Sequence, residues 1–218
     1  VHAAQQRRLA GAAGADQRLF ALYLPAAELT LHAAVHSGAE SERAMLVQAL
    51  DKLAPDDVLL LDRGYPAAWL INLLNERGVR FIMRCDTAGS GSWPALRAFM
   101  RGDQTEAVVR LSAPKQQDAN DWGCSNQAPT VRLVRNTATG AHLRVLLTNL
   151  PADQVPAGAF GALYHQRWRI EEAFKRLKHR LHLEAVSGLS QHALLVDVAA
   201  KVLADNIAAL MCLAAQDA

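Results

Sequence analysis

Four side chains that could act on a phosphodiester recur at fixed intervals late in the sequence. They are Tyr164, Arg167, Glu171 and Lys178, in the spacing Y-x2-R-x3-E-x6-K. A carboxylate is a ligand for hard cations such as Mg²⁺. Arg binds phosphate oxygens as a bidentate fork, whereas Lys binds them as a point charge. These residue types are suited to metal-assisted chemistry on a nucleic acid.

The segment that carries these residues, 161–181, predicts one long helix. Its interior excludes Gly and Pro and is rich in Leu, Arg, Lys, Glu and Ala. At about 100° per residue, the Arg, Glu and Lys fall within about 60° of Tyr164, so the helix would present all four on one face. A second face should pack on the core. It consists of Phe160, Leu163, Ile170, Phe174, Leu177 and Leu181.

The charged face has a structural alternative. Arg167 and Glu171 are four residues apart, so they could form an ion pair on a solvated helix. Such a pair stabilises a helix by roughly 0.2–0.5 kcal/mol. Residue types alone leave both interpretations open.

The spacing of the four residues resembles the signature of insertion-sequence-4-type transposases of the DDE superfamily, which have a ribonuclease H-like core. The resemblance implies that Glu171 is the last of three metal-binding acids. It also implies that Tyr164, Arg167 and Lys178 hold DNA strand ends.

A second motif lies earlier in the chain, in PDDVLLLDRGYP. The apolar run of residues 58–61 predicts a strand buried on both faces of a sheet, and Asp62 ends it. Open α/β sheets bind ligands at the carboxyl ends of their strands. Asp62 could also be a simple turn or cap residue. The DRGY sequence, however, resembles the second-acid motif of the same family, and the two motifs occur in the family's order.

The resemblance therefore implies that Asp62 and Glu171 are the catalytic acids and ligands of Mg²⁺ or Mn²⁺. The family's first acid lies on the opening, central strand of its sheet. No apolar strand that ends in Asp precedes residue 17 here. The chain thus looks like the C-terminal part of a catalytic domain that lacks the first strand and the first acid.

The predicted fold class is α/β, with a ribonuclease H-like mixed sheet, flanking helices, a β-rich insertion and the first strand missing. Residues 1–16 are a loose lead-in, 17–86 the first part of the core, 87–141 the insertion and 142–218 the second part of the core. Expected strands span 17–24, 28–35, 58–61, 79–86, 107–113, 130–136 and 142–150. Expected helices span 41–53, 67–77, 94–100, 161–181 and 191–214.

Three expectations concern single features of this plan. The strands 130–136 and 142–150 should form a hairpin with one solvated face. Trp122, in the polar stretch DANDWGC, is predicted to lie in a loop, where it could stack on a flipped base or simply pack on its neighbours. Asn206, in the apolar last helix, should bond a neighbouring backbone.

The composition is typical of an ordinary globular protein. It has 51% hydrophobic residues, 20% charged residues and a net charge of +2. We expect a cytoplasmic protein with no membrane segment. The three cysteines have no metal-binding or disulfide spacing. Basic residues gather instead at 167–180, which fits either phosphate contacts or a solvated helix.

The resemblance implies that the chain is a DNA transposase of an insertion sequence, which cleaves and transfers DNA strands with metal ions. The resemblance adds transposon ends and target DNA as partners, and a homodimer in the synaptic complex. One alternative is a catalytically inactive DNA-binding remnant of a decayed element. Another is a structural domain whose charged helix face only forms salt bridges.

Overall fold

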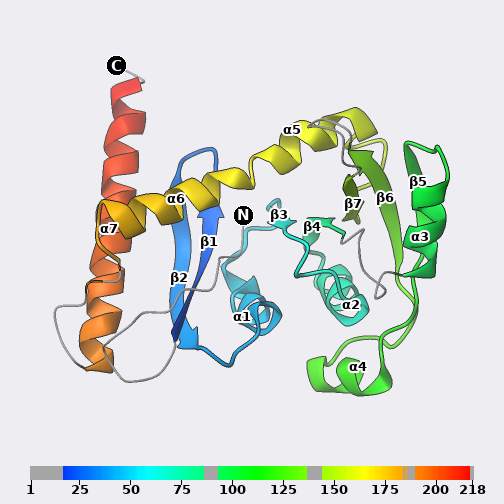
Figure 1. The fold of residues 1–218 in the computed structure, drawn as a ribbon, viewed down its shortest axis with the longest axis horizontal. Coiled ribbons are helices and arrows are strands. Elements are labelled where there is room, and N and C mark those ends of the chain that lie inside the picture. The colour runs from blue at the N-terminus through cyan, green and yellow to red at the C-terminus, as the bar shows by residue number, and fades with distance from the viewer. Residues whose placement is uncertain (1–16, 86–92, 137–143, 184, 186–189, 217–218) are drawn as a thin grey trace. The chain divides into compact units, whose positions relative to one another are not determined.

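The computed structural model describes residues 17–85, 93–136, 144–183, 185 and 190–216 (Figure 1). The chain divides into two compact units. Unit 1 combines Val1–Leu53 with Gln166–Ala218, and unit 2 is the continuous segment Ala54–His165. The predicted lead-in 1–16 and the Gly/Ser-rich stretch 87–92 lie outside the described residues.

Unit 1 is a β-hairpin covered by helices (Figure 1). The two strands, predicted at 17–24 and 28–35, pair antiparallel as a hairpin. The first helix is capped by Ser41, whose Oγ accepts a hydrogen bond from the Ala44 N–H at 3.2 Å. The elements are β1 (Gln17–Leu24), β2 (Leu29–Ser37), α1 (Glu42–Gln48), the 3₁₀ helix η1 (Leu50–Lys52), α6 (Trp168–His179) and α7 (Gln191–Gln216).

The core of unit 1 lies between the hairpin, α6 and α7. The apolar face predicted for the basic helix supplies much of it, because Ile170, Phe174 and Leu177 are all buried there. The other buried members are Leu19, Ala21, Tyr23, Ala173, Leu183, Leu194 and Val198.

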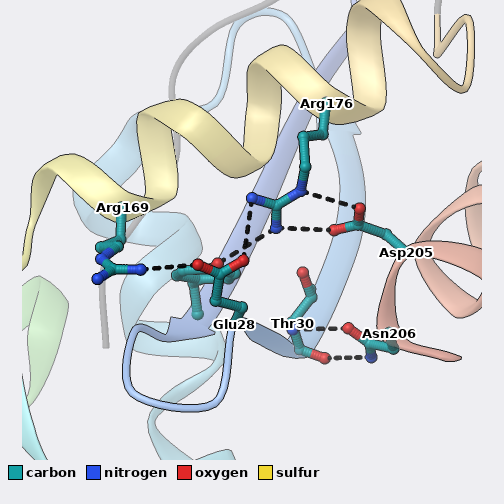
Figure 2. A network of polar contacts seen from close by, with 7 residues as sticks. Glu28, Thr30, Arg169, Arg176, Asp205 and Asn206 are labelled. Atoms are coloured by element: carbon teal, nitrogen blue, oxygen red, sulfur yellow. Dashed lines mark hydrogen bonds and ion pairs between the residues drawn. The ribbon is translucent and has the colours of Figure 1, made fainter. Parts of the chain in front are cut away.

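Asn206 joins α7 to the hairpin, as Figure 2 shows. Its Oδ1 accepts from the Thr30 N–H at 2.8 Å and its Nδ2 donates to the Thr30 carbonyl at 2.9 Å. The expectation that Asn206 bonds a neighbouring backbone is therefore confirmed. One amide side chain satisfies both backbone groups of a strand residue.

Unit 2 is built on a mixed five-stranded sheet in the order β3-β4-β7-β6-β5. Only β3 and β4 are parallel, and a helix connects them. Its elements are β3 (Val58–Leu61), α2 (Ala68–Glu76), β4 (Arg80–Arg84), α3 (Pro94–Arg101), β5 (Glu106–Arg110), α4 (Gln116–Trp122), β6 (Thr130–Asn136), β7 (Arg144–Thr148), the 3₁₀ helix η2 (Ala157–Ala159) and α5 (Phe160–His165).

The strand β7 returns the chain to the core sheet, as predicted, because it pairs with both β4 and β6. The prediction that the β6–β7 hairpin has one solvated face is wrong. Arg132 and Thr148 are buried, with 5% and 0% of their surfaces exposed. Arg132 pairs with Glu106 and donates to the Val155 carbonyl at 2.6 Å. The polar residues that suggested a wet face are thus satisfied inside the protein.

The prediction of one continuous helix over 161–181 is also wrong. α5 ends at His165 and α6 begins at Trp168, with a turn at Gln166 and Arg167. The bond from the Arg169 N–H to the Gln166 carbonyl, at 3.0 Å, spans three residues instead of four. The local sequence YHQRW is rich in aromatic residues, which have lower helix propensity than Leu or Ala. The boundary between the two units falls at this turn.

Candidate functional site

Asp62 follows the end of β3, where the sequence analysis expected it. The strand residues Leu59, Leu60 and Leu61 are buried, whereas Asp62 is partly exposed. Its Oδ1 accepts a hydrogen bond from the Gly64 N–H at 2.7 Å, which is an Asx-type turn. This hydrogen bond supports the interpretation of Asp62 as a turn residue, because it uses one of the two carboxylate oxygens.

Tyr164 is buried in unit 2, with 4% of its surface exposed. Its hydroxyl donates to the Leu61 carbonyl at 3.1 Å, so it bonds the residue that precedes Asp62. Phe160, one helical turn earlier, packs in the same cluster with Leu60 and Ile82. The motif tyrosine thus fixes α5 against the end of the strand that carries Asp62.

The other three motif residues belong to unit 1, with Arg167 at the N-cap of α6 and Glu171 and Lys178 on the helix. Arg167 and Glu171 form an ion pair, with 2.7 Å between Nη2 and Oε1. The side chains are 10% and 22% exposed, so this pair is more buried than a solvated helix pair. The guanidinium of Arg167 also lies 5.3 Å from the ring centroid of Trp168. Lys178 is half-buried farther along the same helix.

Asp62 belongs to unit 2 and Glu171 to unit 1, so the surroundings of each predicted acid are described within its own unit. Among the described residues, His, Cys, Asp and Glu form no group of three that could hold a metal ion. The carboxylate oxygens are the donors that Mg²⁺ and Mn²⁺ prefer. By donor chemistry the two acids fit such an ion, and two acids alone are an incomplete set for this family.

Trp122 is the last residue of α4, so the prediction that it lies in a loop is wrong. Its ring stacks on Trp69 with 4.5 Å between centroids and 6° between planes. Trp69 is buried on α2, and Trp122 is partly exposed. One face of the indole is therefore occupied by the protein itself, as the packing alternative expected.

Several basic residues that suggested phosphate contacts are paired with acids within unit 1. Arg169 binds Glu28 at 2.7 Å, and Lys175 binds Glu172 at 2.7 Å. Such exposed pairs contribute little to stability. They reduce the local positive charge that the sequence alone indicated.

The sequence analysis did not find the network around Arg176, which Figure 2 shows. Nε and Nη2 of Arg176 donate to the two oxygens of Asp205 at 3.2 and 3.3 Å, and Nη1 lies 3.3 Å from Glu28. Burial alone would lower the pKa of Arg176, but its bonds to Asp205 and Tyr23 raise it, so it stays charged. These partners lie 29 to 153 residues away, and no local spacing could reveal them.

Each unit also contains a cavity away from the predicted acids. The cavity of unit 2, about 520 Å³, lies over β5 and β6 beside Glu106 and Arg132. The cavity of unit 1, about 650 Å³, lies between α6 and α7 beside Arg176 and Asp205. In the first cavity Glu106 pairs with Arg132, and in the second Arg176 pairs with Asp205 and Glu28.

Comparison with known proteins agrees with the motif resemblance. The family model described as "Transposase DDE domain" matches residues 4–207. Transposase InsG for insertion sequence element IS4 of Escherichia coli (strain K12) is 25% identical over 174 residues. The match covers 78% of this chain and 38% of that protein.

Two further relatives match a shorter segment. They are the putative transposase InsL for insertion sequence element IS186A of Escherichia coli (strain K12) and the transposase for insertion sequence element IS421 of Escherichia coli. Each is 52% identical over 42 residues, which are 19% of this chain and 11% of the relative. The chain thus spans well under half the length of the curated relatives it matches.

The mixed sheet with flanking helices agrees with the ribonuclease H-like fold that the motifs implied. The family model covers nearly the whole chain, including both motifs. This protein therefore belongs to the family of transposase DDE domains.

Proposed function

We propose that this chain is the C-terminal part of the catalytic domain of an insertion-sequence transposase, an enzyme that cleaves and transfers DNA strands. The observation that carries the proposal is the family match over residues 4–207, which includes DRGY and Y-x2-R-x3-E-x6-K in that order. The position of Asp62 directly after the buried strand β3 supports it. The partners are transposon ends and target DNA, and the location is the cytoplasm.

DDE transposases use divalent metal ions, and Asp62 and Glu171 would hold one in this protein. When bound, Mg²⁺ or Mn²⁺ stabilises the negative charge that develops on the attacking and leaving oxygens of a phosphodiester. Around it, Arg167 would orient Glu171 through their ion pair. Tyr164 would hold the end of β3, and with it Asp62, through its bond to the Leu61 carbonyl.

We further propose that a complete site needs a strand and an acid beyond those described. β3 is the edge of its sheet in the described part of the chain, yet Leu59, Leu60 and Leu61 are buried. An edge strand presents unpaired backbone N–H and C=O groups that can pair with a further strand. A neighbouring strand that ends in the first acid would cover this edge. Catalysis by this chain alone should accordingly be weak or absent.

DNA binding by α6 is the part of the proposal that this chain can test. Lys178→Ala should weaken binding to duplex DNA and reduce the slope of log K against log salt by about 0.9, the value for one lost phosphate contact. Lys175→Ala is the matched control, because it removes the same charge from the same helix at an exposed lysine outside the motif spacing. Fluorescence anisotropy with a labelled duplex from 50 to 200 mM salt measures both.

The outcomes separate the candidate functions. If Lys178→Ala loses more affinity for duplex DNA than Lys175→Ala does, the result supports the assignment of Lys178 as a phosphate contact. Equal losses would contradict it and leave only non-specific attraction by a basic helix. Wild-type binding without strand cleavage in Mg²⁺, even when the missing strand is supplied, would favour the DNA-binding remnant. No binding at all would favour a structural domain.

Metal binding is tested separately by Mn²⁺ titration with electron paramagnetic resonance in a chain extended to include the first strand. Asp62→Asn and Glu171→Gln should each abolish the site. Glu172→Gln, at an exposed glutamate next to Glu171, should leave it unchanged. Retained Mn²⁺ binding in Glu171→Gln would overturn the assignment of the last acid.

A further inference from the structure

Three arginines form a second charged face on α6, separate from the motif. Arg169, Arg176 and Arg180 follow one another at steps of seven and four residues. At about 100° per residue they fall within about 40° of one another. By the same rule, Glu171 and Lys178 lie about 160° to 180° away from Arg169. The motif therefore uses one side of α6, and the three arginines occupy the other.

The arginine face borders the cavity of unit 1. The cavity has a volume of about 650 Å³, and all of its lining residues belong to unit 1. Small-molecule sites typically measure roughly 300–1,000 Å³. The charged residues that line the cavity are Glu28, Arg169, Arg176, Arg180 and Asp205. Positive groups therefore outnumber negative ones, which favours an anionic ligand.

Two of the arginines are bound to acids of the chain, as Figure 2 shows. Arg176 donates to both oxygens of Asp205, at 3.2 and 3.3 Å, and Asp205 is buried. One oxygen of Glu28 lies 2.7 Å from Nη1 of Arg169, and the other lies 3.3 Å from Nη1 of Arg176. The Glu28 carboxylate thus bridges two guanidinium groups, a position that a phosphate group could also take.

Glu28 is easier to displace than Asp205. Its side chain is 41% exposed, and exposed ion pairs are weak. It lies in the turn that joins β1 to β2, with a backbone φ of 55°, a left-handed conformation that is unfavourable for Glu. The Glu28 side chain can therefore leave the arginines without disturbing the core of unit 1.

Arg180 has donors available for a ligand. It is the C-cap residue of α6, and it is exposed. Within the described part of the chain, its guanidinium forms no hydrogen bond or ion pair. A guanidinium carries five N–H donors and cannot lose its charge at neutral pH. Arg180 therefore adds a positive group that no described acid neutralises.

The remainder of the cavity wall is largely apolar. Most of it comes from small side chains of α7, and the apolar members include Leu181, Ala204, Ala208, Ala209 and Leu213. Such a wall can pack against the carbon-containing part of a ligand whose anionic group is held by the arginines. A cavity of this volume is too small to admit a DNA duplex, and its two acids repel a polyanion. These features favour a small molecule.

We propose that the cavity between α6 and α7 binds a small phosphate monoester through Arg169, Arg176 and Arg180, and that the ligand displaces Glu28 from these arginines. A phosphate monoester has a second pKa of about 6, so it carries nearly two negative charges at neutral pH. It also accepts bidentate bonds from arginine, so it can compete with a single carboxylate. The inference goes beyond the proposed function and involves neither DNA nor a metal ion. Its failure would therefore leave the transposase assignment standing.

Isothermal titration calorimetry of the 218-residue chain at low ionic strength tests the site. The probes are inorganic phosphate, adenosine 5′-monophosphate and adenosine. We expect the monophosphate to bind more tightly than phosphate, because its nucleoside also contacts the apolar wall. Adenosine lacks the anionic group and should not bind.

Two substitutions should change the affinity for adenosine 5′-monophosphate in opposite directions. Glu28→Gln removes the competing charge and keeps the size of the side chain, so the affinity should rise roughly tenfold. Arg180→Ala removes a guanidinium that faces the ligand, so the affinity should fall roughly tenfold.

Arg101→Ala is the matched control. It removes an exposed arginine from the end of α3 in unit 2, so it should leave the affinity unchanged. Circular dichroism of each variant verifies that the fold is retained.

Four results would overturn the inference. The first is that neither the wild type nor Glu28→Gln binds phosphate or adenosine 5′-monophosphate. The second is weaker binding by Glu28→Gln, because the carboxylate would then support the ligand. The third is an equal loss in Arg101→Ala and Arg180→Ala, which would indicate general attraction of anions. The fourth is displacement of the monophosphate by a DNA duplex that itself loses affinity in Arg180→Ala, which would make these arginines a DNA contact.

Discussion

At the scale of single residues, burial separates the three cysteines by reactivity. Cys85 is buried, which raises the pKa of its thiol to about 12. Burial also raises the pKa of the Cys124 thiol, although that residue is partly exposed. Cys212 is exposed on α7. Because the thiolate is the reactive form, these environments predict different rates of modification.

We predict that a disulfide reagent at pH 8 modifies Cys212 first and Cys124 more slowly, and that Cys85 reacts only when the protein unfolds. Peptide mapping by mass spectrometry after timed quenching measures each site. Cys85 also predicts a pH effect, because its folded pKa of about 12 exceeds the ordinary thiol pKa of 9.0. The unfolded chain therefore loses this proton first, and stability should fall as pH rises above about 9. Fast labelling of Cys85 in the native chain would contradict its burial.

At the scale of elements, the position of α7 depends on polar contacts as well as on apolar packing. Arg176 of α6 reaches Asp205, and Asn206 reaches the backbone of Thr30. Thr30 is itself buried, so its backbone groups have limited access to water. A buried backbone group that loses its hydrogen-bond partner destabilises the fold more than an exposed group does, because water cannot replace the partner.

Asn206→Ala should lower the free energy of unfolding by about 1–3 kcal/mol, because it leaves the N–H and the carbonyl of Thr30 without their side-chain partner. Asn206→Asp keeps an acceptor for the Thr30 N–H but sets a carboxylate oxygen against the Thr30 carbonyl, so its loss should be at least as large. Urea denaturation followed by circular dichroism compares the two. If both variants match the wild type, the contact in Figure 2 does not stabilise the fold.

At the scale of the whole molecule, the division into two compact units predicts that each unit unfolds in its own transition. A cooperative single domain shows the same unfolding transition by every probe. Unit 1 has its own core around the hairpin, α6 and α7, and unit 2 has a core that includes Leu60, Ile82 and Leu146. The turn at Gln166 and Arg167 joins them at the end of α5.

We predict that unfolding of Trp168→Phe gives different midpoints by tryptophan fluorescence and by circular dichroism. Of the four tryptophans, only Trp168 lies in unit 1, and it is 46% exposed, so its replacement is mild. The remaining fluorescence reports unit 2, whereas circular dichroism reports the helices of both units. Coincident midpoints would show that the units unfold as one.

The sequence alone determined the family, the α/β class and most elements of this protein. Periodicity and breaker residues are local properties, so they located β1, β3, β6 and α7 to within a few residues. The two motifs are local as well. Their residue types and spacing led to the family that the comparisons show.

Only the tertiary structure decided the features that depend on contacts between residues far apart in the chain. The break between α5 and α6 separates Tyr164 from the other motif residues, although helix propensity over the segment favoured continuity. The stacking of Trp122 on Trp69 and the pairing of Arg176 with Glu28 join residues far apart in the chain. Burial and long-range pairing arise from three-dimensional contacts, which local sequence patterns do not specify.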